Sequence, residues 1–226
     1  DDDDDLLVGC PGPEKAYQFA MKNPNFLFAS NAYRKDPHVQ EILANYLDKG
    51  AVLIGEIKFG EEQQHEFLKP YIEVAQQYNV PILLHFQNRF KGKRGWCSLG
   101  LNLNHFEDVL RENPDVNFIA HAVSFWDEME GLSDRLMTDY PNLFADTSAG
   151  SGHRAIHRPG AQKFLLNHHN KLLFGSDCQD PSHSKKHLIP YKRCLGHEVV
   201  ETIKDLVPES VSEKIFNTNA KRLLKL

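Results

Sequence analysis

Short apolar runs alternate along the chain with amphipathic segments. The runs end at polar or glycine-rich stretches and are LLVG (6–9), FLFAS (26–30), AVLIGEIKF (51–59), PILLHF (81–86), VNFIAHA (116–122), NLFADTS (142–148) and KLLFGSD (171–177). They are too apolar for strands with one exposed face, and they indicate strands of a parallel sheet that is covered on both faces. The segments with apolar residues at helical spacing are 14–23, 37–50, 61–79, 104–114 and 161–170.

This alternation predicts an α/β fold built from successive strand–helix units. Such units form either an open doubly wound sheet or a closed barrel. No GxGxxG or GxxxxGK[ST] loop follows the first run, which removes the main reason to prefer a dinucleotide-binding sheet. No break in composition divides the chain. The sequence therefore predicts a single (β/α)8 TIM-barrel domain over residues 1–226.

The predicted strands end in ionisable residues. They are Glu56, His85, His121, Asp146 and Asp177, and consecutive members are about one βα unit apart. In a barrel, functional residues lie at the C-terminal ends of the strands, so these five side chains are expected around one mouth.

Imidazole and carboxylate groups together are typical ligands of zinc, and also of iron, manganese or nickel. Each residue also has a structural explanation when it is taken alone. A histidine in an apolar run is more often a core residue than a ligand, and Asp146 or Asp177 could cap a turn or a helix. Their joint occurrence at successive strand ends favours a metal site.

Composition and charge exclude several other classes of protein. The chain has 226 residues, 41% of them hydrophobic and 25% charged, with a net charge of -5 and a pI near 6.2. An acidic protein without a basic stripe is not expected to bind nucleic acid, and no apolar stretch is long enough to cross a membrane. The four cysteines (Cys10, Cys97, Cys178, Cys194) form no CxxC pair, which predicts reduced thiols and a cytoplasmic protein.

Six segments of the chain resemble the amidohydrolase superfamily, in its branch related to aminocarboxymuconate-semialdehyde decarboxylase. They are GEIKF (55–59), ILLHF (82–86), NFIAHA (117–122), NLFADTSAGSG (142–152), LLFGSDCQDP (172–181) and KIFNTNAKRLLKL (214–226). The resemblance covers nearly the whole chain, and the last two segments are the most specific. It implies a metal-dependent hydrolase, in which a metal-activated water attacks a C–N or C–O bond of a small, carboxylate-bearing substrate.

The resemblance also implies roles for individual residues. Asp177 would be the general base, with His121 as a second catalytic group that binds metal or polarises the substrate. The implied ligands of a divalent metal, zinc first and manganese, iron or nickel as alternatives, are Glu56, His85, His121 and Asp177. The implied substrate contacts are Lys58, Arg154 and Asp146.

One part of the family pattern is missing. The first strand of the family carries His-x-His, and no such motif precedes LLVG, where the chain instead begins with five aspartates at 1–5. This predicts either that strand 1 lies upstream of Asp1 in the natural protein, so that the domain is N-terminally incomplete here, or that the chain is a metal-poor relative.

Three other functions stay open at this point. They are a non-oxidative decarboxylase of the same branch, a TatD-type metal-dependent deoxyribonuclease, and a non-catalytic barrel that has lost its metal. The expected partner is a small-molecule substrate. Binding to nucleic acid or to a membrane is not expected, and the protein could form a homo-oligomer.

Overall fold

The structure is a computed structural model that describes residues 12–33, 36–57, 64–86, 103–178 and 194–226. The chain divides into two compact units, Asp1–Phe118 and Ile119–Leu226. The division falls inside strand β3 (Phe118–His121), which therefore belongs to both units. The single domain expected over residues 1–226 stays a prediction, and each unit is described by itself.

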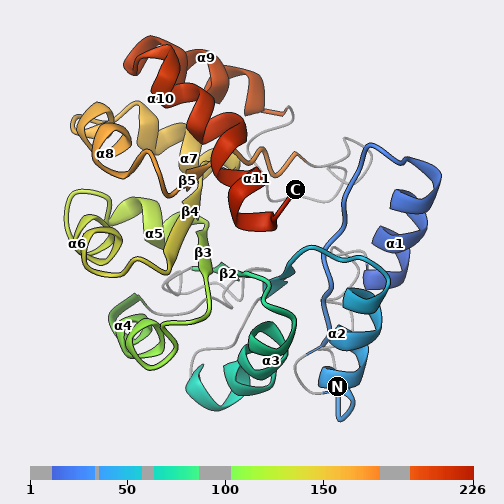
Figure 1. Cartoon of the computed structure of the whole chain (residues 1–226). Helices are drawn as coiled ribbons and strands as arrows, with labels where there is room; N and C mark the ends of the chain where they lie inside the picture. The colour runs from blue at the N-terminus through green and yellow to red at the C-terminus, as the bar shows by residue number, and fades with distance from the viewer. Residues whose placement is uncertain (1–11, 34–35, 58–63, 87–102, 179–193) are drawn as a thin grey trace, which may run out of the picture. The chain divides into compact units, whose positions relative to one another are not determined.

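Among its described residues, the first unit contains two parallel strands and four helices, which Figure 1 labels. In chain order they are α1 (Pro13–Lys22), α2 (Val39–Asp48), β1 (Ile54–Ile57), α3 (Gln64–Tyr78), β2 (Ile82–His85) and α4 (Leu103–Glu112). In the register of β1 and β2, Ile54 pairs with Ile82 and Ile57 with Leu84. The predicted strand FLFAS is reduced to one isolated bridge, between Ser30 and Ile54, and LLVG lies outside the described residues.

Aromatic side chains fill the core of the first unit. Phe86, Phe106 and Phe118 are all fully buried. Their rings pack edge to face, with centroids 4.9 Å apart for the first pair and 5.6 Å apart for the second. Such contacts add to the hydrophobic gain of burial, so α4 is held between the end of β2 and the start of β3.

The second unit contains the rest of β3, two more strands and seven α-helices among its described residues. The elements after β3 are α5 (Val123–Asp127), α6 (Leu132–Asp139), β4 (Leu143–Asp146), α7 (Ala149–Ile156), α8 (Ala161–His168), β5 (Leu172–Leu173), α9 (Gly196–Leu206), α10 (Glu209–Glu213) and α11 (Asn219–Leu224). Strands β4 and β5 are parallel, and the strand order β1-β2-β3-β4-β5 follows the chain.

Every residue of β3 and β4 is buried. This confirms the prediction of strands covered on both faces, which is typical of parallel sheets. The sequence did not predict α5 and α6 between these strands. Helix α5 has only five residues, too few to show a helical period.

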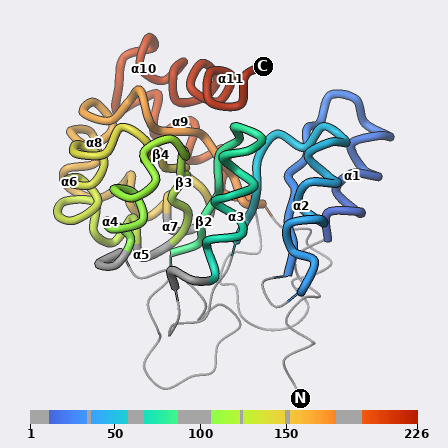
Figure 2. The backbone as a smooth tube through the Cα atoms, turned by 60° about the horizontal axis from the view of Figure 1, so that its bottom comes forward, coloured from blue at the N-terminus to red at the C-terminus, as the bar shows by residue number. Residues whose placement is uncertain are grey.

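The C-terminal segment packs against β5. A π-helical turn (Lys214–Thr218) joins α10 to α11 without a break (Figure 2). The Phe174 backbone N–H donates to the carbonyl oxygen of Ile215 at 2.8 Å, and the Asn219 side-chain amide donates to the carbonyl oxygen of Leu172 at 2.8 Å. These bonds satisfy backbone groups at the end of the short strand β5.

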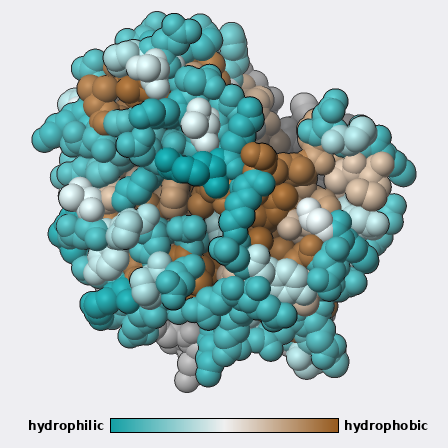
Figure 3. Space-filling model, viewed as in Figure 1, coloured by the Kyte–Doolittle hydropathy of each residue, from teal (hydrophilic) through white to brown (hydrophobic). Residues whose placement is uncertain are grey.

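Hydrophilic residues predominate on the face of the molecule seen in Figure 3, with apolar residues in smaller areas. None of the described helices is both long and apolar enough to cross a membrane.

A disulfide joins Cys178 to Cys194, whose Cα atoms lie 4.9 Å apart. The prediction of reduced thiols is therefore wrong for this pair, while Cys10 and Cys97 lie outside the described residues. Spacing along the chain did not reveal the pair, because the two cysteines are 16 positions apart and meet only in the fold.

We expect this disulfide to stabilise the native state. Cross-linking a loop of this length removes conformational entropy from the unfolded chain, worth about 3 kcal/mol. The double variant Cys178→Ser/Cys194→Ser should lower the free energy of unfolding by about that amount in urea denaturation. Wild-type protein treated with a dithiol reductant should match the variant. Four free thiols in unreduced, denatured protein would contradict the bond.

Lys171 precedes β5, and its ammonium group points toward the C-terminal end of α6. It donates to the carbonyl oxygens of Met137 and Tyr140, the second at 3.0 Å. Burial lowers the pKa of Lys171 from 10.5 to about 8, because removal from water disfavours the charged form.

Because the pKa of Lys171 is lowered, the free energy of unfolding is expected to change with pH in the alkaline range. Between about pH 8 and 10.5 the unfolded chain retains a proton that the folded chain has lost, so the free energy of unfolding should rise with pH. The variant Lys171→Met should lack this part of the rise in urea denaturation. The exposed Lys163, changed to Met in the same way, provides the control and should keep it. Equal pH dependence in all three proteins would contradict the assignment.

Candidate metal centre

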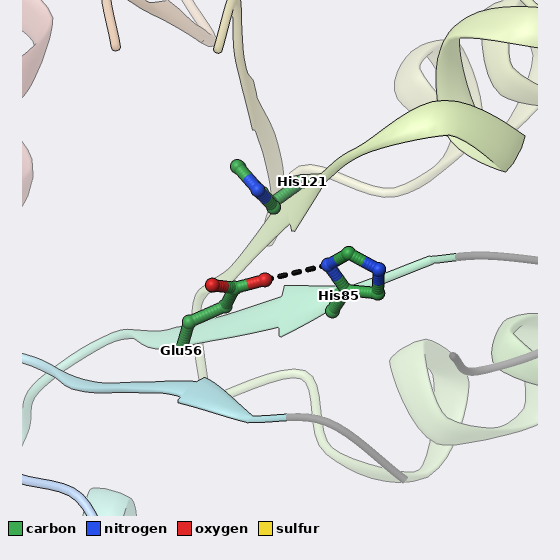
Figure 4. Close-up of side chains that lie close together, drawn as sticks. All are labelled: Glu56, His85 and His121. Atoms are coloured by element: carbon green, nitrogen blue, oxygen red, sulfur yellow. Dashed lines mark hydrogen bonds and ion pairs between the residues drawn. The ribbon is translucent and has the colours of Figure 1, made fainter. Parts of the chain in front are cut away.

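Glu56 and His85 form a pair at the ends of β1 and β2. His85 Nδ1 lies 2.5 Å from Glu56 Oε1, and Figure 4 shows the two side chains pointing toward one another. The His85 side chain is 9% exposed and the Glu56 side chain 19%. The side-chain amide of Asn31 donates to the backbone oxygen of Glu56 at 2.9 Å. The two strands are parallel, which brings their carboxyl ends to the same edge of the sheet.

Gly55 allows the close approach of β1 to β2 that this pair needs. Its φ is +139°, and a Cβ atom there would lie 2.6 Å from the backbone oxygen of Leu83. Only glycine adopts this conformation readily and leaves that space open.

His121 and Asp146 form a second pair, at the ends of β3 and β4. His121 Nδ1 lies 3.1 Å from Asp146 Oδ1 and 3.0 Å from Oδ2. The Ser148 backbone N–H also donates to Asp146 Oδ1, at 3.1 Å. Trp126 Nε1–H donates to the backbone oxygen of Asp146 at 2.9 Å. All four residues are buried. Two donors, His121 and the Ser148 N–H, hold the carboxylate, and the Trp126 indole fixes the main chain that carries it.

Asp177 lies just after β5, within reach of His121. Its Oδ2 is 3.9 Å from His121 Nε2, which is too long for a direct hydrogen bond. Two ligand atoms on one tetrahedral zinc ion, each about 2.0 to 2.2 Å from it, would lie roughly 3.3 to 3.6 Å apart, somewhat closer than this pair. The Asp177 side chain is 41% exposed. Its φ of 46° is in the left-handed region, which aspartate enters more readily than most residues.

The donor chemistry of these residues fits a divalent metal. His121 contacts a carboxylate through Nδ1 and faces Asp177 with Nε2, and buried imidazole with carboxylate suits zinc, manganese or iron. A carboxylate on the second ring nitrogen is a common way to orient a histidine ligand.

The structure brings the predicted site residues together within each unit. Glu56 meets His85 in the first unit, and His121 meets Asp146 and Asp177 in the second. Lys58 lies outside the described residues. Arg154 lies on α7 with an exposed side chain, and its contact with substrate stays a prediction.

The sequence did not single out Asn31, Trp126 or Ser148. Asn31 directly follows the apolar run FLFAS, so its position just after a strand was a signal of the kind used for the other residues. Ser148 ends the run NLFADTS in the same way. Trp126 carried no such signal, because its contact with the Asp146 carbonyl depends on how α5 packs.

No protein-family model and no curated protein sequence matches the chain. Several solved structures do match. A 2,6-dihydroxybenzoate decarboxylase complexed with 2,6-dihydroxybenzoate is 18% identical, with 98% of this chain and 78% of that one covered and a TM-score of 0.61. A dihydroorotase from Campylobacter jejuni is 18% identical, with coverage of 96% and 72% and a TM-score of 0.62. A TatD homologue from Escherichia coli is 12% identical, with coverage of 94% and 82% and a TM-score of 0.62.

These likenesses establish the fold. The chain has an α/β fold with a parallel sheet that matches TIM-barrel structures of the amidohydrolase superfamily. Strands β1 to β5 are the part of the barrel seen in the described residues. The predicted fold class, and the predicted resemblance at the level of fold, are confirmed.

Gly175 keeps the segment after β5 close to the end of β4. A Cβ atom at this position would lie 2.2 Å from Ser148 Oγ and 3.5 Å from Asp146 Cβ. We therefore expect Gly175→Ala to lower the free energy of unfolding by about 1 to 3 kcal/mol in urea denaturation, because it overpacks a buried contact.

Two further variants check the cause of this loss. Adding Ser148→Ala to Gly175→Ala removes the nearest atom and should recover part of the lost stability. The control Gly12→Ala adds a Cβ where no atom lies within 4 Å and should be close to wild type. An unaltered stability in Gly175→Ala would contradict the close packing.

Proposed function

We propose that the protein is a metal-dependent enzyme that acts on a small substrate bearing a carboxylate. In this proposal the residues that the sequence predicts as ligands, Glu56, His85, His121 and Asp177, bind a divalent ion. The observation that carries it is that two buried histidines, each beside a carboxylate, lie at the C-terminal ends of parallel strands. Functional groups of TIM-barrel enzymes are found in this position.

The proposed reaction is hydrolysis of a C–N or C–O bond. A divalent cation bound in such a site would lower the pKa of a water molecule and polarise a carbonyl group. Asp177 accepts the proton of the attacking water at its carboxylate and returns it to the leaving group. Its partial exposure supports this role, since a substrate can reach it. His121 Nε2 faces the same carboxylate and orients the groups that react.

Zinc is the proposed metal, with manganese, iron or nickel as alternatives, because the donor set suits all four. Lys58 and Arg154 are the proposed partners of the substrate carboxylate, and an Arg side chain would bind it through two parallel hydrogen bonds. The cytoplasmic location and a homo-oligomer stay predictions. Disulfides are rare in reducing compartments, so the state of Cys178 and Cys194 in native protein bears on the location.

Non-oxidative decarboxylation is the second candidate reaction. It is favoured by the likeness in fold to a decarboxylase that holds an aromatic carboxylate. The TatD-type nuclease is less favoured, because a net charge of -5 repels the phosphate backbone of nucleic acid.

Metal binding tests the proposed site. Protein dialysed against a chelator and titrated with Zn²⁺ or Mn²⁺ in a calorimeter should bind one ion per chain. Glu56→Gln, His85→Ala and His121→Ala should each weaken binding by at least about tenfold, since each removes a ligand. The exposed His38, changed to Ala, is the matched control and should bind like wild type. A wild-type protein that binds neither ion would contradict the proposal.

Two substrates distinguish the candidate reactions. The metal-loaded protein is incubated with dihydroorotate, whose ring opens by hydrolysis, and with 2,6-dihydroxybenzoate, which releases CO2 on decarboxylation. Asp177→Asn should lower turnover of the accepted substrate by about 10² to 10⁴-fold, because the proton acceptor is lost. Turnover equal to wild type in this variant would contradict the role of Asp177.

A further inference from the structure

Both carboxylate oxygens of Asp146 face the same ring nitrogen. His121 Nδ1 is 3.0 Å from one and 3.1 Å from the other, and the Asp146 side chain is only 10% exposed. An ionised carboxylate can only accept hydrogen bonds. Nδ1 lies within hydrogen-bond distance of this carboxylate and must therefore carry the proton, whereas Nε2 is 3.9 Å from Asp177 Oδ2, beyond that distance.

We propose that Asp146 is a positioning residue, which holds His121 as the Nδ1–H tautomer and does not itself contact the substrate. In a neutral imidazole one nitrogen is a donor and the other an acceptor. With the proton fixed on Nδ1, the lone pair is on Nε2, the atom that lies 3.9 Å from Asp177 Oδ2. Without this carboxylate the two tautomers would compete, and a part of the molecules would present N–H to the reacting groups.

The main chain around Asp146 leaves its carboxylate little freedom. Trp126 Nε1–H donates to its backbone oxygen, and the Ser148 N–H donates to Oδ1. The next residue is also tied, because the Thr147 N–H donates to the Leu173 carbonyl oxygen at 3.0 Å. Ser148 is the residue before α7, so the turn into that helix supplies the donor. The substrate contact that the sequence predicts for Asp146 would need a carboxylate that is not already occupied in this way.

The first unit repeats the arrangement independently. There Glu56 Oε1 lies 2.5 Å from His85 Nδ1, not from Nε2. A contrasting histidine is present in the second unit, where His168 Nε2 lies 2.7 Å from Asp134 Oδ1. The same reasoning assigns His168 the opposite tautomer, with the proton on Nε2, which provides an internal reference.

The tautomer can be read directly in metal-free protein. Nitrogen-15 NMR of protein labelled at histidine distinguishes protonated from unprotonated ring nitrogens. The spectra are recorded at rising pH until the histidine signals no longer change, so that the rings compared are neutral. His121 should show Nδ1–H and an unprotonated Nε2, and His168 the reverse. His121→Ala assigns the signals by their loss. A wild-type His121 with the proton on Nε2 would overturn the proposal, and this measurement needs no variant at Asp146.

Asp146→Asn then tests whether the carboxylate is the cause. The amide can offer either oxygen or N–H to the ring, so His121 should change to a mixture of tautomers while His168 stays as it was. Asp134→Asn is the matched control and should alter His168 alone. An unchanged His121 in Asp146→Asn would overturn the proposal, as would a change in His168 of the same size.

A binding measurement connects the tautomer to the site. This step rests on the proposed function. Asp146→Asn should weaken Zn²⁺ binding by about 10 to 100-fold, with Asp146→Glu recovering part of it. Equal affinity despite a changed tautomer would overturn the positioning role. A wild-type protein that binds no Zn²⁺ would instead defeat the metal proposal and leave the tautomer assignment intact.

Discussion

The burial of β3 and β4 on both faces is the constraint on which the rest of the second unit depends. All residues of these strands are removed from water, so the polar groups at their ends must find partners inside the protein. An unpaired buried donor or acceptor costs about 1 to 3 kcal/mol. His121 and Asp146 meet this requirement together, and the Trp126 indole satisfies the Asp146 carbonyl group. The hydrogen bonds that make burial tolerable also orient the imidazole.

The first unit solves the same problem with different residues. Glu56 is the third residue of a four-residue strand, and His85 is the last residue of the next strand. Their contact depends on Gly55, which lets the two strands approach closely. In both units a carboxylate faces Nδ1 of a histidine at a strand end. A preformed arrangement of this kind suits catalysis, because the side chains need not reorganise when a substrate binds.

The fold is shared by proteins with different chemistry, among them a decarboxylase, a dihydroorotase and a TatD homologue. A fold of this kind therefore does not define a reaction. What can define it here is the set of groups around Asp177 and His121, together with the positive charges that would hold a carboxylate.

The sequence by itself determined the positions of β1 to β5, the burial of β3 and β4 on both faces, and the ionisable residues at the ends of the strands. These features are local, since an apolar run and the residue that ends it can be read within a few positions. Only the tertiary structure decided the partners: Glu56 with His85, Asp146 with His121, and Cys178 with Cys194. It also reduced FLFAS to a single bridge and added Trp126 to the site. Partnership depends on strand register, on close approach at Gly55 and Gly175, and on helix packing, all of which join residues far apart in the chain.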